Sequence, residues 1–170
     1  MKVAVLMGVS GCGKTTVGEL LAKSLNCRFY DGDDYHPDCN KEKMRLGTPL
    51  DDTDRAPWLA ALNQIVADAI KDKKSIVLAC SALKEKYREK LLDDLEKDER
   101  DEVGFFYLKG EEAMLCRRLA SRRHEYMNPN LLASQIATLE EPDRKNAVYL
   151  DACLTPQELV AEIITVMSTQ

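Results

Sequence analysis

The sequence predicts an α/β protein with three layers, in which helices cover both faces of a parallel sheet. Short apolar runs alternate with amphipathic helical stretches along all 170 residues, and this alternation is typical of parallel strands joined by helices. The first apolar run, at residues 3–7, leads into a glycine-rich stretch at 8–15 and then into a helical pattern. Because the length is that of one domain, we expect a single domain over residues 1–170.

Five apolar runs are the predicted strands of this sheet. They lie at residues 3–7, 27–30, 75–80, 103–108 and 148–150. The run at 75–80 is continuously apolar, as expected of a parallel strand that is buried on both faces. The run at 148–150 is the weakest of the five.

Helices are predicted where apolar residues recur every three or four positions. These stretches lie at 16–25, 58–70, 84–95, 111–121 and 131–139. Pro57 stands near the first turn of the second stretch, where proline is tolerated. A final helix is expected after Thr155, because Thr155 and Glu158 have the spacing of a capping box. The charged stretch 93–102 is interpreted as a solvated helix end and loop.

Two segments interrupt the alternation of strands and helices. Residues 34–74 contain no strong strand, and a connection of this length has room for more than one helix. We interpret this segment as a substrate-binding insertion. Residues 122–130 break the helical pattern and begin with two arginines, so we interpret them as a lid loop that closes over the site.

The composition narrows the class of protein. A formal net charge of −5 argues against general binding of nucleic acid, which needs a basic face. The apolar runs are too short for a signal peptide or a membrane span, so we expect a cytoplasmic protein. Six cysteines are scattered singly, and we interpret them as reduced thiols. Cys12 is either a reactive thiol beside a helix N-terminus or a small residue at a permissive position.

Residues 8–15 read G-x-x-x-x-G-K-T between a predicted strand and a predicted helix. In this context, glycines let the backbone curl until its N–H groups and the helix N-terminus face a phosphate. Lys14 is expected to bridge the outer phosphates, and Thr15 is expected to offer its hydroxyl to Mg²⁺. A nucleoside triphosphate is therefore the predicted ligand. The predicted nucleotide-binding residues of the loop are Gly8, Val9, Ser10, Gly11, Cys12, Gly13, Lys14, Thr15 and Thr16.

The second metal ligand is predicted at the end of the second strand. Many proteins with this loop hold Mg²⁺ with a carboxylate that ends another strand, but the run at 75–80 ends without one. Asp31 and Asp33 are the nearest candidates by topology. We assign Asp31 to Mg²⁺ through water and Asp33 to an acceptor hydroxyl, whose proton it takes during phosphoryl transfer.

Four arginines are concentrated near the predicted lid, although the protein is acidic overall. A transferring phosphoryl group needs positive charge and exclusion of water. Arg122 is predicted to contact the transition state, and Arg118 is predicted to lie near the nucleotide. Arg117 and Arg123 are better explained as members of an exposed basic face.

Several motifs in this order resemble the gluconokinase family. They are G-V-S-G-x-G-K at 8–14, D-G-D-x-x-H-P at 31–37, K-M-x-x-G-x-P-L-x-D-x-D-R-x-P-W-L at 43–59, S-A-L-K at 81–84 and S-Q-x-x-T-L-E at 134–140. The loop is shared by many families, whereas the other motifs together are highly specific. In the lid the family usually reads Gly-His-Phe, and this chain has His124, Glu125 and Tyr126, which puts a lid role for His124 in doubt.

The resemblance implies an enzyme that uses MgATP to phosphorylate the C6 hydroxyl of D-gluconate. It implies a P-loop kinase fold similar to that of shikimate and nucleoside-monophosphate kinases, with a five-stranded parallel sheet, a substrate lobe and a lid. In shikimate kinase a similar pair of aspartates has the roles given above to Asp31 and Asp33. Family members are often dimers, so a homodimer is possible. For this substrate, the cationic candidates that could bind the carboxylate are Arg55, Lys84 and Arg88. The polar candidates that could bind the hydroxyl groups are His36 and Ser81.

Alternatives remain open from the sequence. His36, which precedes Pro37, is as well explained by ordering of its loop as by substrate contact. A shikimate-type or nucleoside-monophosphate kinase would share the loop. A guanine-nucleotide switch is a different class, but the D-x-x-G at 101–104 precedes a strand instead of following one, and N-K-x-D is missing from the sequence.

Overall fold

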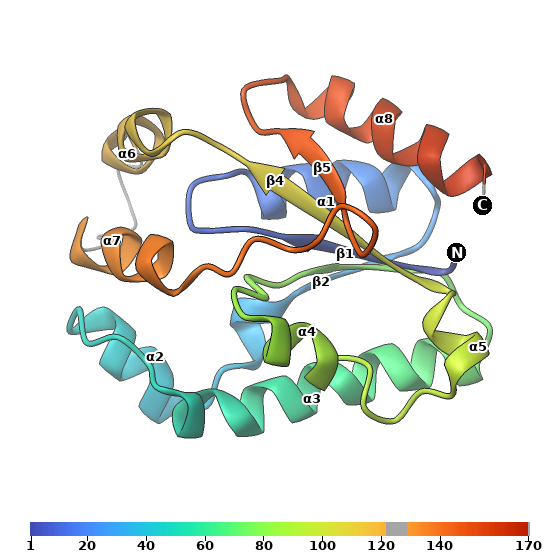
Figure 1. Ribbon diagram of the computed structural model, residues 1–170, viewed down its shortest axis with the longest axis horizontal. Coiled ribbons are helices and arrows are strands. Elements are labelled where there is room, and N and C mark those ends of the chain that lie inside the picture. Colours follow the sequence, from blue (N-terminus) through green and yellow to red (C-terminus); the bar gives the residue numbers. More distant parts are fainter. Residues whose placement is uncertain (122–128, 170) are drawn as a thin grey trace.

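A five-stranded sheet forms the centre of the computed structural model, which describes residues 1–121 and 129–169. The strands stand in the order β2-β3-β1-β4-β5, and every neighbouring pair is parallel (Figure 1). The predicted fold class and the five parallel strands are therefore confirmed. The bounds of the strands are β1 (Val3–Met7), β2 (Arg28–Asp31), β3 (Ile76–Ala79), β4 (Val103–Lys109) and β5 (Val148–Asp151).

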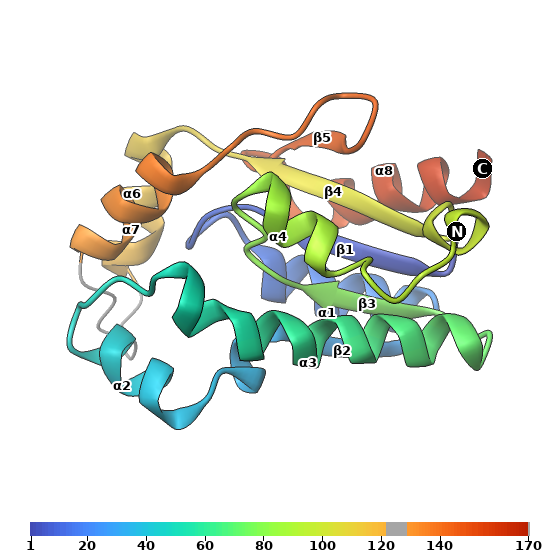
Figure 2. The ribbon, with the colours of Figure 1, turned by 60° about the horizontal axis from the view of Figure 1, so that its bottom comes forward.

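Helices cover both faces of the sheet (Figures 1 and 2). Helices α1 (Lys14–Ser24) and α8 (Pro156–Thr169) pack on one face, and α3 (Asp52–Lys71) and α4 (Glu85–Lys90) pack on the other. Successive side chains of a strand point to opposite faces, so the central strand β1 contributes to both cores. Val3, Val5 and Met7 face α3, and Ala4 and Leu6 face α1 and α8.

Three of the remaining helices lie at the carboxyl ends of the strands. Figures 1 and 2 show α2 (Asp38–Arg45), α6 (Glu112–Ser121) and α7 (Pro129–Thr138) gathered at this end of the molecule. Helix α5 (Lys97–Arg100) precedes β4 at the opposite end. No helix in the described ranges is long and apolar enough to cross a membrane.

Helix α3 begins earlier than predicted. Asp51 and Asp54 form a reciprocal capping box, in which each side chain accepts a hydrogen bond from the other residue's backbone N–H, at 2.8 and 3.1 Å. The helix therefore starts at Asp52, and Pro57 lies inside it instead of near its first turn. The apolar periodicity begins only at Trp58, which is why the prediction missed the polar first turns.

Two other predictions of secondary structure were wrong in part. The helix predicted at 84–95 ends at Lys90, and a second capping box, between Glu96 and Glu99, opens α5 within the stretch predicted to be a loop. Helix α2 has almost no apolar residues and gave no periodic signal. The predicted lid at 122–130 lies outside the described residues except for its last two positions, which are the start of α7.

Gly32 connects the sheet to the 3-10 helix η1 (Gly32–Tyr35). A Cβ atom at this position would lie 2.5 Å from the carbonyl oxygen of Ala79 and 3.3 Å from Leu62. Only glycine therefore lets the chain leave β2 so close to β3. This close approach places the two aspartates that flank Gly32 at the carboxyl edge of the sheet.

Replacement of Gly32 by alanine should destabilise the protein by about 2 kcal/mol or more, because overpacking against a backbone atom forces the chain to shift. Chemical denaturation measures the free energy of unfolding. Gly47→Ala is the control: Gly47 has a positive φ of 76°, and strain of this kind costs about 1 kcal/mol. Equal losses in the two variants would contradict the steric argument.

Candidate active site

The loop between β1 and α1 curls around its own lysine. The Nζ atom of Lys14 donates hydrogen bonds to the carbonyl oxygens of Gly8 at 2.9 Å and Val9 at 3.2 Å. Gly8 in turn donates its N–H to the carbonyl oxygen of Ser81, which follows β3, at 3.2 Å. The loop thus lies above the central strands with α1 beginning at its end, as the phosphate-binding interpretation requires.

Thr15 and Asp31 meet although they lie on different elements. The Thr15 hydroxyl, in the first turn of α1, donates to Oδ2 of Asp31 at 2.8 Å. The other carboxylate oxygen, Oδ1, accepts the backbone N–H of Asp33 at 3.1 Å. A hydroxyl and a carboxylate are the hard oxygen ligands that Mg²⁺ prefers, and Mg²⁺ needs only one or two of them from the protein. The residues present therefore fit the predicted metal site.

Asp33 lies at the edge of a cavity of about 440 Å³ that joins the loop to the predicted insertion. Ser10 and Lys14 line the cavity from the loop, and Ser81 lines it from the end of β3. The cavity therefore brings together the predicted donor lysine and the predicted acceptor carboxylate. Its other walls come from η1, α2, α3, α7 and the segments that connect to these helices and to β3, through Asp34, His36, Lys41, Met44, Arg45, Pro49, Leu50, Arg55, Trp58, Leu83, Leu131, Ser134 and Gln135.

His36 is buried in the wall of this cavity. Its ring stacks on Trp58 with the centroids 4.2 Å apart, and Trp58 donates its indole N–H to the carbonyl oxygen of Gly32 at 2.6 Å. The pKa of His36 is lowered from 6.5 to about 4 by burial, and further by the positive charges of Arg55 and Lys41. His36 is therefore neutral at pH 7, and its buried Nδ1 atom has no hydrogen-bond partner among the described residues.

Three cations face the cavity from the insertion, and two of them were not predicted. Arg55 was predicted to bind substrate, and its guanidinium donates to the Leu50 carbonyl and to the Tyr87 hydroxyl. Lys41 and Arg45 lie on α2, a helix without apolar periodicity, so no sequence signal directed attention to them. Together these cations make the cavity suitable for an anionic ligand.

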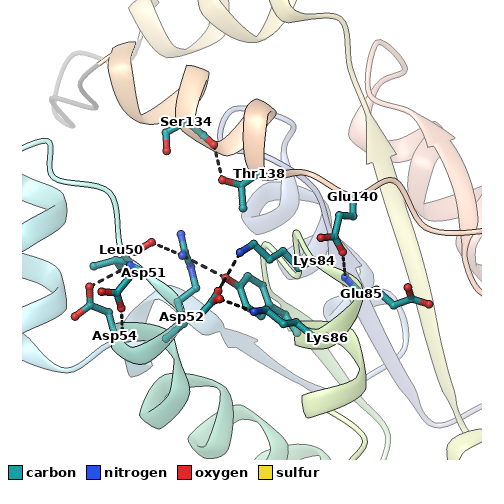
Figure 3. Close-up of polar contacts among 12 residues, drawn as sticks. Leu50, Asp51, Asp52, Asp54, Lys84, Glu85, Lys86, Ser134, Thr138 and Glu140 are labelled. Carbon is teal, nitrogen blue, oxygen red and sulfur yellow. Dashed lines mark hydrogen bonds and ion pairs between the residues drawn. The ribbon is translucent and has the colours of Figure 1, made fainter.

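Lys84 and Arg88, both predicted to contact substrate, do not line this cavity and contact other groups of the protein. Figure 3 shows Lys84 and Lys86 directed at Asp52, where Lys84 forms an ion pair at 3.0 Å. The same carboxylate accepts the Tyr87 hydroxyl, and these hydrogen bonds hold the pKa of Asp52 far below its usual range. Lys84 therefore fixes α4 to the start of α3.

Arg88 is buried, and its guanidinium donates to the carbonyl oxygens of Ala82 and Glu140, both at 3.0 Å. Burial lowers its pKa. The charged guanidinium thus donates its hydrogen bonds to backbone oxygens, which need donors when they are buried. Arg88 therefore connects the loop after β3 to the segment after α7, and it does not line the cavity.

The predicted lid lies mostly outside the described residues, but Arg118, which precedes it, is described. Arg118, on α6, donates to the carbonyl oxygens of Cys12 at 3.4 Å and Ala152 at 2.8 Å. This position beside the loop agrees with the predicted role near the nucleotide. Arg122, predicted to contact the transition state, lies outside the described residues, as does His124.

Cys12 is fully buried within the core under the loop. Its position supports the interpretation as a small core residue, because a thiol without exposure reacts slowly with alkylating agents. All six cysteines are free thiols.

Gln135 is a further residue of the site to which the sequence analysis gave no role. Its side-chain oxygen accepts the backbone N–H of Ser10 at 2.7 Å. Helix α7 therefore contacts the phosphate-binding loop directly. The sequence signal was the S-Q-x-x-T-L-E motif, which indicated the family without indicating what the glutamine touches.

A larger cavity, of about 650 Å³, opens at the amino ends of β4 and β5, away from the loop. Charged residues of both signs line it, and two of them, Arg100 and Glu89, pair with each other at 3.3 Å. The smaller cavity is the better candidate for an active site, because it joins a phosphate-binding loop, a carboxylate and several cations.

Comparisons with known proteins agree with this geometry. The sequence model described as shikimate kinase matches residues 10–167. A probable gluconokinase from Xenopus tropicalis is 48% identical over 176 residues, which cover 95% of this chain and 90% of that protein. A crystal structure of a gluconokinase from Sinorhizobium meliloti 1021 has a TM-score of 0.82 at 38% identity, over 94% of this chain and 87% of that one.

A second solved structure, of an unliganded sugar kinase from Janibacter sp. HTCC2649, has a TM-score of 0.89 at 32% identity. The match covers 99% of this chain and 95% of that one. The likenesses in sequence and in structure thus extend over nearly the whole chain. On these grounds the chain, which also fits the shikimate kinase model over most of its length, belongs to the gluconokinase family.

Proposed function

We propose that the protein transfers the γ-phosphoryl group of ATP to the C6 hydroxyl of D-gluconate and releases 6-phospho-D-gluconate and ADP. The observation that carries this proposal is the cavity that joins the phosphate-binding loop, Asp33 and three cations of the insertion. A kinase for a sugar acid needs these three parts together. The gluconokinase relatives at up to 48% identity support gluconate as the acceptor.

The donor half of the site holds the triphosphate. Lys14 exchanges the carbonyl oxygens of Gly8 and Val9 for the outer phosphates, which are stronger acceptors because they are charged. The loop amides and Arg118 bind the rest of the nucleotide. Thr15 and Asp31 are the residues that would hold Mg²⁺, and the ion would neutralise charge on the phosphates.

The acceptor half orients the hydroxyl that attacks. Asp33 accepts the hydrogen bond of the C6 hydroxyl, which directs the oxygen at the γ-phosphorus, and takes the proton as the new P–O bond forms and the bond to ADP breaks. The backbone N–H of Asp33 donates to Asp31, which holds the main chain that carries this carboxylate. Arg122 is proposed to neutralise charge as the phosphoryl group moves.

The insertion at 34–74 binds the sugar acid. Arg55 pairs with the carboxylate of gluconate, and Lys41 and Arg45 add to the positive potential. His36 and Ser81 bind hydroxyl groups, with His36 as an acceptor because its ring is neutral. The contacts of Lys84 and Arg88 within the protein make both weaker candidates for this role, and we propose no substrate contact for them.

Other functions are less well supported. A shikimate-type kinase shares the loop and the fold, but shikimate kinase structures resemble this chain at only 19% identity, which supports the fold alone. A guanine-nucleotide switch would need a base-binding motif that the sequence does not contain. We further propose that the enzyme is cytoplasmic and has a lid at 122–130; a homodimer remains a prediction from the family.

Asp33→Asn should lower kcat by about two to four orders of magnitude, which is the usual contribution of a general base, with binding of MgATP retained. A coupled assay of ADP release with gluconate measures the rate, and calorimetry measures nucleotide binding. Asp38→Asn, on the exposed start of α2, is the control and should retain the rate. A nearly normal rate in Asp33→Asn would assign this carboxylate a structural role.

Arg55→Ala should raise the KM for gluconate about 10- to 100-fold, the range expected for a lost charged hydrogen bond, with the KM for ATP changed by less than about twofold. Steady-state kinetics with each substrate varied in turn separates the two effects. Arg55→Lys should fall between, since it keeps the charge without the planar fork. Arg100→Ala, at the opposite edge of the sheet, is the control. If Arg55→Ala raised the KM for ATP more than the KM for gluconate, Arg55 would belong to the nucleotide site instead.

His36 should make stability depend on pH. Its pKa is about 4 in the fold and about 6.5 in the unfolded chain, so only the unfolded state takes up the proton between these values. The free energy of unfolding should therefore fall as the pH drops from 6.5 towards 4, by up to about 3 kcal/mol. Denaturation of the wild type and of His36→Gln at pH 7, 6 and 5 tests this: the variant should show a shallower loss, and parallel curves would contradict the shifted pKa.

A further inference from the structure

The hydrogen bond between Gln135 and Ser10 joins the two halves of the site. Gln135 lies on α7, 125 positions along the chain from Ser10, and its amide oxygen is 2.7 Å from the Ser10 nitrogen. Both residues line the cavity that contains Lys14 and Asp33. The contact is therefore located where the donor phosphate and the acceptor hydroxyl must meet.

The oxygen of Gln135 takes a place that suits a phosphate oxygen. Backbone N–H groups of such a loop are the donors that bind phosphates, and a donor without a partner costs free energy. Lys14 donates to the Gly8 and Val9 carbonyls, which belong to the loop itself. The Ser10 N–H is satisfied from outside the loop, by a neutral amide.

Helix α7 is anchored independently of this contact. Glu140 lies just after the helix, and its backbone N–H donates to the Leu83 carbonyl at 2.8 Å. The carboxylate of Glu140 accepts the N–H of Glu85 at 2.7 Å (Figure 3). Leu132 is buried in the core on the α1 side of the sheet. A change at Gln135 can therefore be made without releasing the helix.

We propose that Gln135 is a positioning residue that couples nucleotide binding to the acceptor pocket. Its amide oxygen accepts the Ser10 N–H, a donor that a bound phosphate would also need. A phosphate oxygen is charged and accepts more strongly than an amide, so the nucleotide takes this donor and frees the side chain of Gln135. The freed amide, still carried by α7, then donates its N–H₂ group to an acceptor hydroxyl in the cavity.

Two consequences follow for binding. Gln135 competes with the nucleotide, so its removal strengthens nucleotide binding. The nucleotide also strengthens binding of the acceptor, and linkage makes this effect reciprocal. The second consequence rests on the proposed function, because it requires the acceptor to occupy this cavity, whereas the first requires only the phosphate-binding loop.

Calorimetric titration of the Mg²⁺ complex of a non-hydrolysable ATP analogue, without acceptor, tests the competition. Gln135→Leu should bind the analogue about two- to tenfold more tightly than the wild type, as expected from the loss of one competing hydrogen bond. Gln135→Glu should bind it at least about tenfold more weakly, because a carboxylate holds the Ser10 N–H more strongly and repels phosphate. Gln64→Leu is the matched control: Gln64 bonds Asp68 within α3, and its replacement should leave binding unchanged.

Titration of gluconate with and without the analogue tests the coupling. In the wild type the analogue should increase gluconate affinity, and in Gln135→Leu this increase should disappear. Circular dichroism and thermal melting verify that each variant is folded. Unchanged or weaker analogue binding by folded Gln135→Leu would overturn the inference even if gluconate is phosphorylated normally. Failure to bind gluconate in the wild type, with the predicted order of analogue affinities intact, would instead count against gluconate as the substrate.

Discussion

The hydrogen bond from the Trp58 indole to the Gly32 carbonyl, at 2.6 Å, is the contact on which the acceptor side of the site depends. It fixes α3 to the turn that carries Asp31 and Asp33, and the face of the same indole supports His36. Both partners are buried, so the bond forms where water does not compete and an unpaired indole N–H would be costly. One aromatic side chain thus sets the position of a carboxylate turn and of a neutral histidine.

The parts of the fold that could be predicted are those encoded by local physical rules. The phosphate loop, the alternation of strands and helices and the cap at Thr155 each depend on neighbouring residues, and the structure contains them. Helix α2 was missed because it lacks an apolar face and is held by polar contacts of Asn40 and Lys43 with Asp54. The helix after Lys84 was predicted to be too long. Leu91 and Leu95 are buried as expected, but they lie after the end of the helix, in turns that bury them equally well.

The site was predictable where the chain order alone brings residues together. Thr15 follows β1 and Asp31 ends β2, and the carboxyl ends of these parallel strands lie at the same edge of the sheet with β3 between them, so both residues could be expected at this edge. The partners of the long cationic side chains could not be predicted. Lys84, Arg55 and Arg88 all lie near the same motifs, and only the packed structure shows which groups each of them contacts. Arg55 faces the cavity, Lys84 meets Asp52 and Arg88 meets backbone carbonyls. The stacking of His36 on Trp58 likewise depends on two segments that have no local relation.

The distribution of charge reconciles an acidic protein with an anionic ligand. The chain has a net charge of −5, yet Lys14, Lys41, Arg45 and Arg55 line one cavity. Many of the carboxylates lie elsewhere and form surface ion pairs, which contribute little to stability. Positive potential is thereby concentrated at the proposed site for phosphate and sugar acid, and such a potential raises the association rate of anions.

The buried guanidinium of Arg88 has a consequence for local unfolding. It bridges the carbonyls of Ala82 and Glu140, and Glu140 closes the same junction through the N–H of Glu85. These segments are more than fifty residues apart in sequence, and if either detached, the buried guanidinium would lose an acceptor. The loop after β3 and the end of α7 should therefore behave as one cooperative unit, whose backbone amides exchange with deuterium together and at nearly the same rate.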